Sequence, residues 1–222
     1  MHLRIHKEGL VFFVFSCLLT IIITPFYTII GILLAILSGY IFYFFRDPIR
    51  AVPKEDVVVS PADGIITFIG SSKNPLDNEA DQNNYHIISI FLNIFDVHVN
   101  RMPIDSLIKS INYIPGKFFN ATLDKSSKEN ERNIIYAKKN EENFYVVQIA
   151  GLIARRIVCN IKNNQEIYKG DRIGIIKFGS RVDLYIPDNY NILVSKGQRV
   201  IGGETIISNP NNIKNINNTI LK

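Results

Sequence analysis

The chain has 222 residues, of which 47% are apolar, and a formal net charge of +5. This length allows one domain of moderate size with an appendage. The positive charge suits an anionic membrane surface better than nucleic acid, because the sequence has no Lys/Arg-rich helix with interleaved aromatic residues. Its two cysteines form no CxxC motif, so the sequence predicts neither a disulfide framework nor a zinc site.

The first feature along the chain is a run without any charged residue, from Gly9 to Phe45. It is about twice the ~20 residues that one helix needs to span the hydrocarbon of a bilayer, and Pro25 divides it. One long kinked helix and a pair of helices both fit this length. The pair is favoured by basic residues at both ends of the run, since a hairpin places both ends on the cytoplasmic face; these are Arg4, Lys7, Arg46 and Arg50.

Two other interpretations of the apolar run are disfavoured. A cleaved signal peptide would end at a small-residue processing site, but the run continues past any such site. A buried hairpin in a soluble core would need unusually long helices. We therefore predict a membrane-associated helical hairpin over residues 1–50 and a separate domain over residues 51–222.

The remaining chain is dominated by short segments with strand character. A strand, a Pro-Ala-Asp-Gly turn and a second strand are predicted over 57–70, and 86–103 is rich in strand residues. Residues 118–133 are polar and predict a long surface loop. The sequence KGDRI at 169–173 is echoed by KGQRV at 196–200, which indicates two hairpin-like units. The fold class predicted for 51–222 is mainly β, a small barrel or sandwich of short antiparallel strands.

Three residues offer reactive chemistry next to turns or strands. Asp63 lies in the Pro-Ala-Asp-Gly turn, where an ordinary turn aspartate would accept backbone N–H bonds. His98 stands at a strand position between Asp96 and Arg101, and it is either a general base or a buried hydrogen-bonded histidine. Ser180 follows Gly179 in a strand-like run, where the pair is either a β-bulge or a functional break.

Asp63, His98 and Ser180 supply the residue types of an acid, a base and a nucleophile. A serine hydrolase is nevertheless disfavoured. Ser180 lacks the G-x-S-x-G elbow, and a strand rather than a helix follows it.

Five motifs together give the sequence a resemblance to a known family. In chain order they are SPADG at 60–64, FDVHVNRMP at 95–103, ENERN at 129–133, QIAGLIARRIV at 148–158 and KFGSRVD at 177–183. In this order and spacing the chain resembles the short-chain class of phosphatidylserine decarboxylase proenzymes. The resemblance extends through nearly all of 51–222, and the apolar N-terminus is similar too.

The resemblance implies a self-processing enzyme. The bond between Gly179 and Ser180 would be cut by the protein itself, and Ser180 would become a pyruvoyl group, a covalent cofactor. The large and small chains would stay together as a heterodimer. The pyruvoyl group would form a Schiff base with phosphatidylserine, an anionic phospholipid, and release CO2 and phosphatidylethanolamine. The resemblance implies no metal and no diffusible cofactor, and it places the enzyme on the cytoplasmic membrane with its catalytic domain facing the cytoplasm.

Residue by residue, Asp63 matches the acid of the family, His98 its histidine and Ser180 the processed serine. Longer members carry a second histidine where this chain has Arg101, which leaves the division of base and proton-donor roles open. Arg101 is instead a candidate contact for the phosphate or carboxylate of the substrate, because a guanidinium binds such groups in a fork geometry.

The alternative from another functional class is a membrane-tethered module of the lipoyl, biotinyl or export-adaptor kind. Such a carrier needs a modifiable lysine at an exposed hairpin tip. Lys169 and Lys196 each stand directly before glycine and have the pattern of turn residues. The alternative also gives no reason for the Gly179–Ser180 break.

Overall fold

The computed structural model describes residues 4–76, 81–116, 129–151, 156–177, 180–210 and 219–221. The chain divides into two compact units, Met1–Ile49 and Arg50–Lys222.

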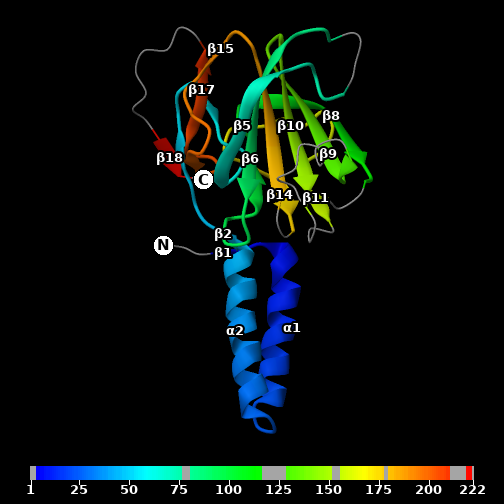
Figure 1. Cartoon of the computed structure of the whole chain (residues 1–222), viewed down its shortest axis with the longest axis vertical. Helices are drawn as coiled ribbons and strands as arrows, with labels where there is room; N and C mark the ends of the chain where they lie inside the picture. Colours follow the sequence, from blue (N-terminus) through cyan, green and yellow to red (C-terminus); the bar gives the residue numbers. More distant parts are fainter. Residues whose placement is uncertain are drawn as a thin grey trace. The chain divides into compact units, whose positions relative to one another are not determined.

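The first unit is a pair of helices with a small strand pair at its open end (Figure 1). A turn containing Pro25 separates the helices, so the apolar run forms two helices rather than one kinked helix. No helix within the described residues is both long and apolar enough to cross a bilayer. The elements are β1 (Arg4–Ile5), α1 (Lys7–Ile23), α2 (Thr28–Phe44) and β2 (Arg46–Asp47), and β1 pairs antiparallel with β2.

Aromatic and small residues pack the two helices together. The rings of Phe13 and Phe42 lie 5.5 Å apart, one from each helix. A Cβ atom on Gly9 would come within 2.3 Å of the side chain of Phe45, so only glycine allows this approach. At the start of α1, Nδ1 of His6 accepts a hydrogen bond from the backbone N–H of Glu8 and caps the helix.

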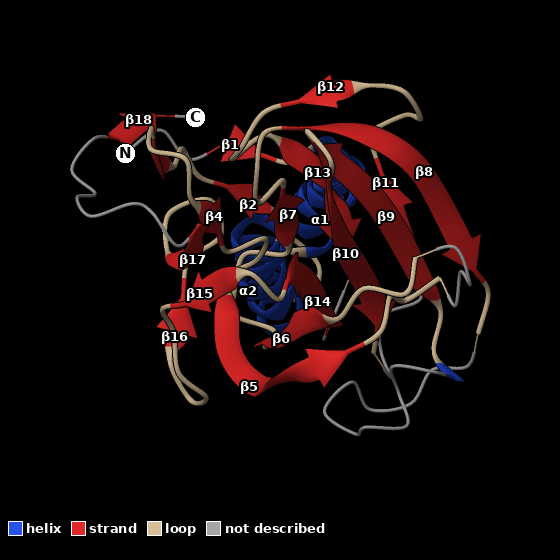
Figure 2. Ribbon diagram, turned by 90° about the horizontal axis from the view of Figure 1, so that it is seen from above, coloured by secondary structure: helices blue, strands red, loops and turns tan. Residues whose placement is uncertain are grey.

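The second unit is built on one curled, eight-stranded antiparallel sheet, which Figure 2 shows as an arc of strands. The strand order is β12-β8-β9-β10-β14-β6-β5-β16. In that order the strands are β12 (Glu166–Ile167), β8 (Ser106–Ile114), β9 (Arg132–Lys139), β10 (Glu142–Ala150), β14 (Ser180–Pro187), β6 (Tyr85–Leu92), β5 (Gly64–Ser72) and β16 (Arg199–Val200).

Three smaller antiparallel sheets complete this unit. The first has the order β11 (Ile157–Cys159), β13 (Arg172–Ile176), β7 (Val99–Arg101), and the second β15 (Tyr190–Ile192), β17 (Ile206–Pro210), β4 (Val58–Val59). The third pairs β18 (Thr219–Leu221) with β3 (Ala51–Pro53). The predicted mainly β class with antiparallel strands is confirmed. The repeated Lys-Gly sequence marks two turns, because Gly170 and Gly197 have φ values of +83° and +87°.

The two faces of the large sheet carry different side chains. On β14, Val182, Leu184 and Ile186 belong to the main hydrophobic core. The alternate residues of β14 face a second cluster that contains Tyr85, Ile134, Tyr145, Val147 and Ile149. Because Ser180 is two residues before Val182, its side chain lies on the face of the main core.

The surface loop predicted for 118–133 is wrong at its end. Residues 117–128 lie outside the described part of the chain, but Asn130, Glu131 and Asn133 are at most 3% exposed. Their polar side chains are buried because backbone and side-chain groups of the neighbouring strands bind them.

Candidate active site

The SPADG turn places Asp63 against an arginine. Nη2 of Arg50 lies 2.9 and 2.8 Å from the two carboxylate oxygens of Asp63, and the backbone N–H of Gly202 donates to Oδ1 at 2.8 Å. Burial raises the pKa of Asp63, and the attraction of Arg50 opposes this shift without cancelling it. Two backbone hydrogen bonds fix the turn. The carbonyl of Pro61 accepts the N–H of Arg101, and the carbonyl of Ser60 accepts the N–H of Gly203, both at 2.8 Å.

Asp96 forms a second acid–arginine pair close to the first. Its Oδ2 accepts the backbone N–H of Asn93 at 2.9 Å, and its Oδ1 binds Nη2 of Arg199. Burial is the main cause of the raised pKa of Asp63. Repulsion from the carboxylate of Asp96 raises this pKa further. Asp63, which is partly buried, and Asp96, which is buried, thus each pair with an arginine of their own.

His98 is fully buried, and its ring is held by the main chain. Nδ1 lies 3.0 Å from the carbonyl oxygen of Asp96. A carbonyl can only accept, so Nδ1 carries the hydrogen of this bond, and Nε2 is the basic nitrogen of the neutral ring. The carbonyl of His98 accepts the N–H of Ile176 at 3.3 Å, which places His98 beside the strand that leads to Ser180.

Ser180 is the first residue of β14 and is 0% exposed. It pairs with Ala150 of β10 on one side and with Leu92 of β6 on the other. Within the described part of the chain, Oγ of Ser180 has no hydrogen-bond partner. A buried hydroxyl without a partner costs about 1–3 kcal/mol, so the Oγ of Ser180 calls for an explanation, and the glycine before it in the sequence is consistent with a chemical role. Gly179, and with it the Gly179–Ser180 bond, lies outside the described residues.

The ENERN motif fixes the end of β10 next to Ser180. Nδ2 of Asn130 donates to the carbonyl of Ala150 at 2.8 Å, and the N–H of Ala150 donates to the carbonyl of Glu131 at 2.9 Å. Oε1 of Glu131 accepts the N–H of Ile157 at 3.1 Å. These side chains thus hold the strand end that is directly opposite Ser180.

A chain of three buried amides links the large sheet to the His98 segment. Nδ2 of Asn133 donates to Oε1 of Gln148 at 3.0 Å, and Nε2 of Gln148 donates to Oδ1 of Asn100 at 2.9 Å. All three residues lie within the motifs quoted above, but the sequence pattern assigns none of them a role. The signal that it offered was a polar residue at inward positions of apolar strands, as in FYVVQIAG at 144–151.

Arg101 lies in the interior rather than at the surface. It is 1% exposed, and its Nη1 donates to the carbonyl of Gly170 at 2.8 Å. Its proposed contact with the substrate stays a prediction. The same holds for the orientation of His98 by Asp63, because the described hydrogen bonds of Asp63 go to Arg50 and Gly202.

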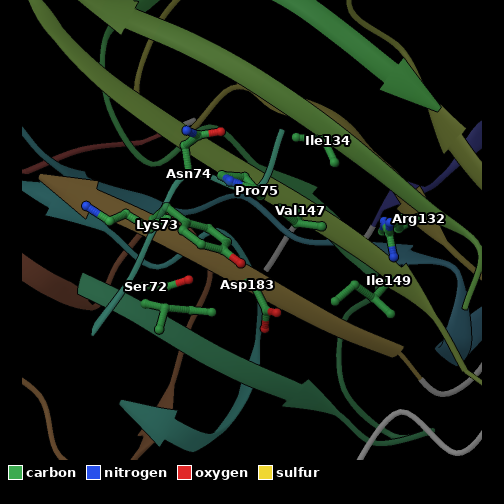
Figure 3. A pocket seen from close by; sticks show the side chains of 11 residues that line it. Ser72, Lys73, Asn74, Pro75, Arg132, Ile134, Val147, Ile149 and Asp183 are labelled. Atoms are coloured by element: carbon green, nitrogen blue, oxygen red, sulfur yellow. The ribbon is translucent and has the colours of Figure 1, made fainter. Parts of the chain in front are cut away.

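A cavity of about 400 Å³ lies on the other face of the large sheet (Figure 3). Ile134, Val147 and Ile149 line it, together with the cationic side chains of Lys73 and Arg132. Asp183 and Tyr185 of β14 also line the cavity. Side chains alternate along a strand, so these two lie on the face opposite that of Ser180. This cavity therefore lies on the face of the sheet opposite the side chain of Ser180.

Comparison with known proteins identifies the family. Residues 37–208 match the family model described as phosphatidylserine decarboxylase. The chain belongs to the phosphatidylserine decarboxylase family. It is 50% identical over 208 residues to the phosphatidylserine decarboxylase proenzyme of Ehrlichia chaffeensis. The aligned region covers 92% of this chain and 91% of that protein. It is 47% identical over 206 residues to the proenzyme of the same name from Rickettsia akari, covering 92% and 89%.

Membership of the phosphatidylserine decarboxylase family favours an enzyme over the carrier module. The matched residues include all five motifs. The environment of Lys169 agrees, because this lysine is 6% exposed and its Nζ binds the carbonyl of Glu55 rather than standing at a free hairpin tip.

Proposed function

We propose that this chain is the precursor of a self-processing phosphatidylserine decarboxylase, which converts phosphatidylserine to phosphatidylethanolamine and CO2. Family membership supports this function, and relatives about half identical are named proenzymes. The structural observation that carries it is the fully buried hydroxyl of Ser180 at the start of β14, which has no hydrogen-bond partner among the described residues. Glycine precedes this serine in the sequence, and the lack of a Cβ allows close approach to the peptide carbonyl.

Processing begins at the hydroxyl of Ser180. Oγ adds to the carbonyl carbon of Gly179 and loses its proton to a base, then the C–N bond breaks and the nitrogen takes up a proton, which leaves an ester. A base next removes the α-proton of Ser180, and the C–O bond breaks to release the chain that ends at Gly179. The dehydroalanine left at 180 hydrolyses to a pyruvoyl group and ammonia.

We assign the base of these steps to His98. Its Nδ1–H is bound to a carbonyl, so Nε2 is the atom that can take up a proton. Asp63 would contribute its negative charge, which stabilises a positive imidazolium nearby. Within a buried site such charges act at low dielectric and are little screened by salt.

The position of Ser180 fits a covalent pyruvoyl group. Its reactive oxygen is shielded from water and bonds to no other described residue, and the opposite residue on β10, Ala150, carries only a methyl group. A pyruvoyl group supplies an electron sink for the loss of CO2 from an amino acid head group. His98 would hold and return protons at Nε2. No metal and no diffusible cofactor enter this proposal.

The two chains formed by cleavage would remain one heterodimer. The small chain, residues 180–222, would begin with β14, which pairs with β10 from Ser180 to Tyr185 and with β6 from Ser180 to Pro187. Its inward residues are part of the main core. Cutting the bond before Ser180 breaks none of these pairings.

We further propose that the helical unit attaches the enzyme to the cytoplasmic face of the membrane that holds its phospholipid substrate. Large apolar side chains cover the outside of both helices, among them Val11, Ile21 and Ile29, which are 70–77% exposed. Exposed apolar surface of this extent marks a contact with membrane or protein. The basic residues that flank the helices suit an anionic lipid surface.

The intact mass of the purified chain tests this function. Two masses that correspond to residues 1–179 and to 180–222 with a pyruvoyl end are expected, together with CO2 release from phosphatidylserine. A single uncut chain that decarboxylates phosphatidylserine would contradict the proposed mechanism.

A further inference from the structure

The amide of Asn100 has one bound end and one unbound end. Oδ1 accepts Nε2–H of Gln148 at 2.9 Å, and the amide of Gln148 is itself oriented by Nδ2–H of Asn133 at 3.0 Å. Nδ2 of Asn100 has no hydrogen-bond partner in the described part of the chain, although the residue is 0% exposed. The two N–H donors of Nδ2 thus lie in the interior without an acceptor among the described residues, which costs free energy unless a reacting group uses them.

Strand register and hydrogen bonding relate these donors to Ser180 and His98. Ser180 pairs with Ala150 and Val182 pairs with Gln148, so Gln148 is the diagonal neighbour of Ser180 on the same face of the sheet. Diagonal neighbours are separated by about 7–8 Å, and the side chain of Gln148 extends to Asn100. His98 and Asn100 are two residues apart in an extended segment, and their side chains therefore point to the same side.

We propose that Asn100 is a catalytic hydrogen-bond donor of the processing reaction, which rests on the function proposed above. When Oγ of Ser180 adds to the carbonyl of the preceding peptide bond, the proton of Oγ passes to Nε2 of His98 and the π electron pair moves to the carbonyl oxygen. Nδ2–H of Asn100 stabilises that oxyanion until the C–N bond breaks and the nitrogen takes up the proton. Gln148 and Asn133 are positioning residues that turn the N–H end of Asn100 toward the reaction.

The arrangement has the properties of a preorganised donor. The amide is fixed before the reaction by two successive hydrogen bonds, so no reorientation is needed when charge develops. It is shielded from water, which makes a hydrogen bond to an anion stronger than in solution. Donors of this kind contribute about 10²–10³ to a rate.

The test is a time course of self-cleavage in freshly translated, labelled full-length chain. Asn100→Asp keeps an oxygen acceptor for Gln148 but removes the N–H donors, and it should slow cleavage by about 10²–10³. Asn100→Ser retains a donor and should cleave faster than Asn100→Asp. Asn112→Asp is the matched control, because the side chain of Asn112 bonds only to Ser110 on β8 in the described structure, and it should cleave at the rate of the wild type.

Hydroxylamine distinguishes a catalytic donor from a structural residue. It cuts the ester intermediate and leaves a free amine on Ser180, so the wild-type chain caught during processing should yield this fragment. Asn100→Asp should yield far less of this fragment over the same time, because the ester forms about 10²–10³ more slowly, while its thermal unfolding temperature shows that it is folded. Gln148→Leu, which releases the amide of Asn100, should give an intermediate rate.

Two results would overturn the role of Asn100. The first is an Asn100→Asp chain that cleaves as fast as the wild type. The second is an Asn100→Asp chain that accumulates the hydroxylamine-sensitive ester, which would place the defect after the acyl shift. A wild-type chain that never cleaves would instead refute the proposed function itself, and the role of Asn100 with it.

Discussion

Arg50 binds both carboxylate oxygens of Asp63 through Nη2, at 2.9 and 2.8 Å. The sequence predicts Arg50 as one of the basic residues that flank the apolar hairpin. In the structure Arg50 is the first residue of the second unit and is 7% exposed. Its guanidinium binds the aspartate of the SPADG turn. Because the pair is largely buried, the loss of one partner leaves an uncompensated charge in the interior.

Arg50→Met should destabilise the protein by about 3–5 kcal/mol, the range for breaking a buried pair. The sign of the pH dependence follows from the pKa of Asp63, which burial raises despite Arg50. The folded state then binds the proton of Asp63 more tightly than the unfolded state, so this group stabilises below its unfolded pKa, and stability falls as pH rises through the folded pKa. Without Arg50 the fall should be larger.

Urea unfolding of wild type and Arg50→Met between pH 4 and about 7 measures this difference. The double variant Arg50→Met/Asp63→Asn is the control. It carries no buried unpaired charge and should recover part of the stability and lose the steeper pH dependence. Equal slopes in all three proteins would show that the pair has no electrostatic role.

Residues 1–49 should determine membrane association. Deleting them removes the exposed apolar surface of α1 and α2 but leaves Arg50 on Asp63. The shortened chain should move from the membrane to the soluble fraction on sedimentation and should still self-cleave. Deletion of 1–50 is the matched control, and it should lose stability because it also removes Arg50. Recovery of the 50–222 chain only with membranes would assign the attachment to the second unit.

His98→Gln should block self-cleavage, because glutamine can hydrogen-bond but cannot accept the proton at the position of Nε2. Gel analysis of the expressed protein measures the cut fraction. His86→Gln, on β6, is the control histidine and should cleave normally. Added imidazole should restore slow cleavage to a smaller variant, His98→Gly, if a base is what is missing. Normal processing of His98→Gln would remove His98 from the mechanism.

Asp81 provides a pH-dependent contribution to stability away from the active site. Burial opposes its ionisation, but hydrogen bonds from Tyr145, Tyr85 and Asn143 outweigh burial and lower its pKa. A lowered carboxyl pKa stabilises the fold above the unfolded value near ~3.9, and this stability is lost as pH falls through the folded pKa. Urea unfolding below pH 5 should therefore show a shallower pH dependence for Asp81→Asn than for the wild type.

The tyrosine hydroxyls that bind Asp81 should stabilise the fold most at pH values where Asp81 is ionised. Tyr145→Phe removes a 2.6 Å bond to Oδ2 and should cost about 1.5–3 kcal/mol at neutral pH, as expected for a hydrogen bond to a charge. The loss should shrink when Asp81 is protonated. A cost that is unchanged at low pH would indicate that packing of the ring, rather than the hydrogen bond, is responsible.

Local patterns in the sequence were enough for the mainly β class of residues 51–222, while the roles of Asp63, His98 and Ser180 stay predictions. The charge-free run broken by Pro25 predicts two helices, and alternation predicts strands on both sides of Asp63. The sequence could not predict which strands pair, because β14 lies between β10 and β6, each far away in the sequence. The same non-local pairing brings Gln148 to Asn100, and no short-range pattern encodes that contact.

The buried ENERN motif shows the same limit. A polar stretch predicts exposure unless specific partners bury it, and the partners of Asn130 and Glu131 are backbone groups at residues 150 and 157. These become neighbours only when the sheet has formed. Arg50 was likewise unpredictable, since a basic residue after an apolar run fits a membrane flank as well as it fits an ion pair.

The decisive prediction concerns Ser180. The wild-type protein should consist of a chain ending at Gly179 and a chain starting with a pyruvoyl group at 180. Ser180→Ala should remain a single, inactive chain, because no hydroxyl is present to attack the carbonyl. Ser180→Cys should cleave slowly, since a thiol is also a nucleophile. Ser208→Ala is a matched control, because this serine on β17 is equally buried and its Oγ likewise has no partner in the described part of the chain. Its substitution should leave cleavage intact.

The new chain end distinguishes this chemistry from proteolysis. A pyruvoyl group has no amine, so the small chain should resist Edman degradation, and borohydride in the presence of phosphatidylserine should add the mass of the lipid to it. The buried position of Ser180 also excludes it from a protease unless β14 first leaves the sheet. Cleavage should therefore proceed at the same rate in purified protein at any dilution, as an intramolecular reaction requires. A small chain that sequences normally from Ser180, or a rate that rises with protein concentration, would show that another molecule makes the cut.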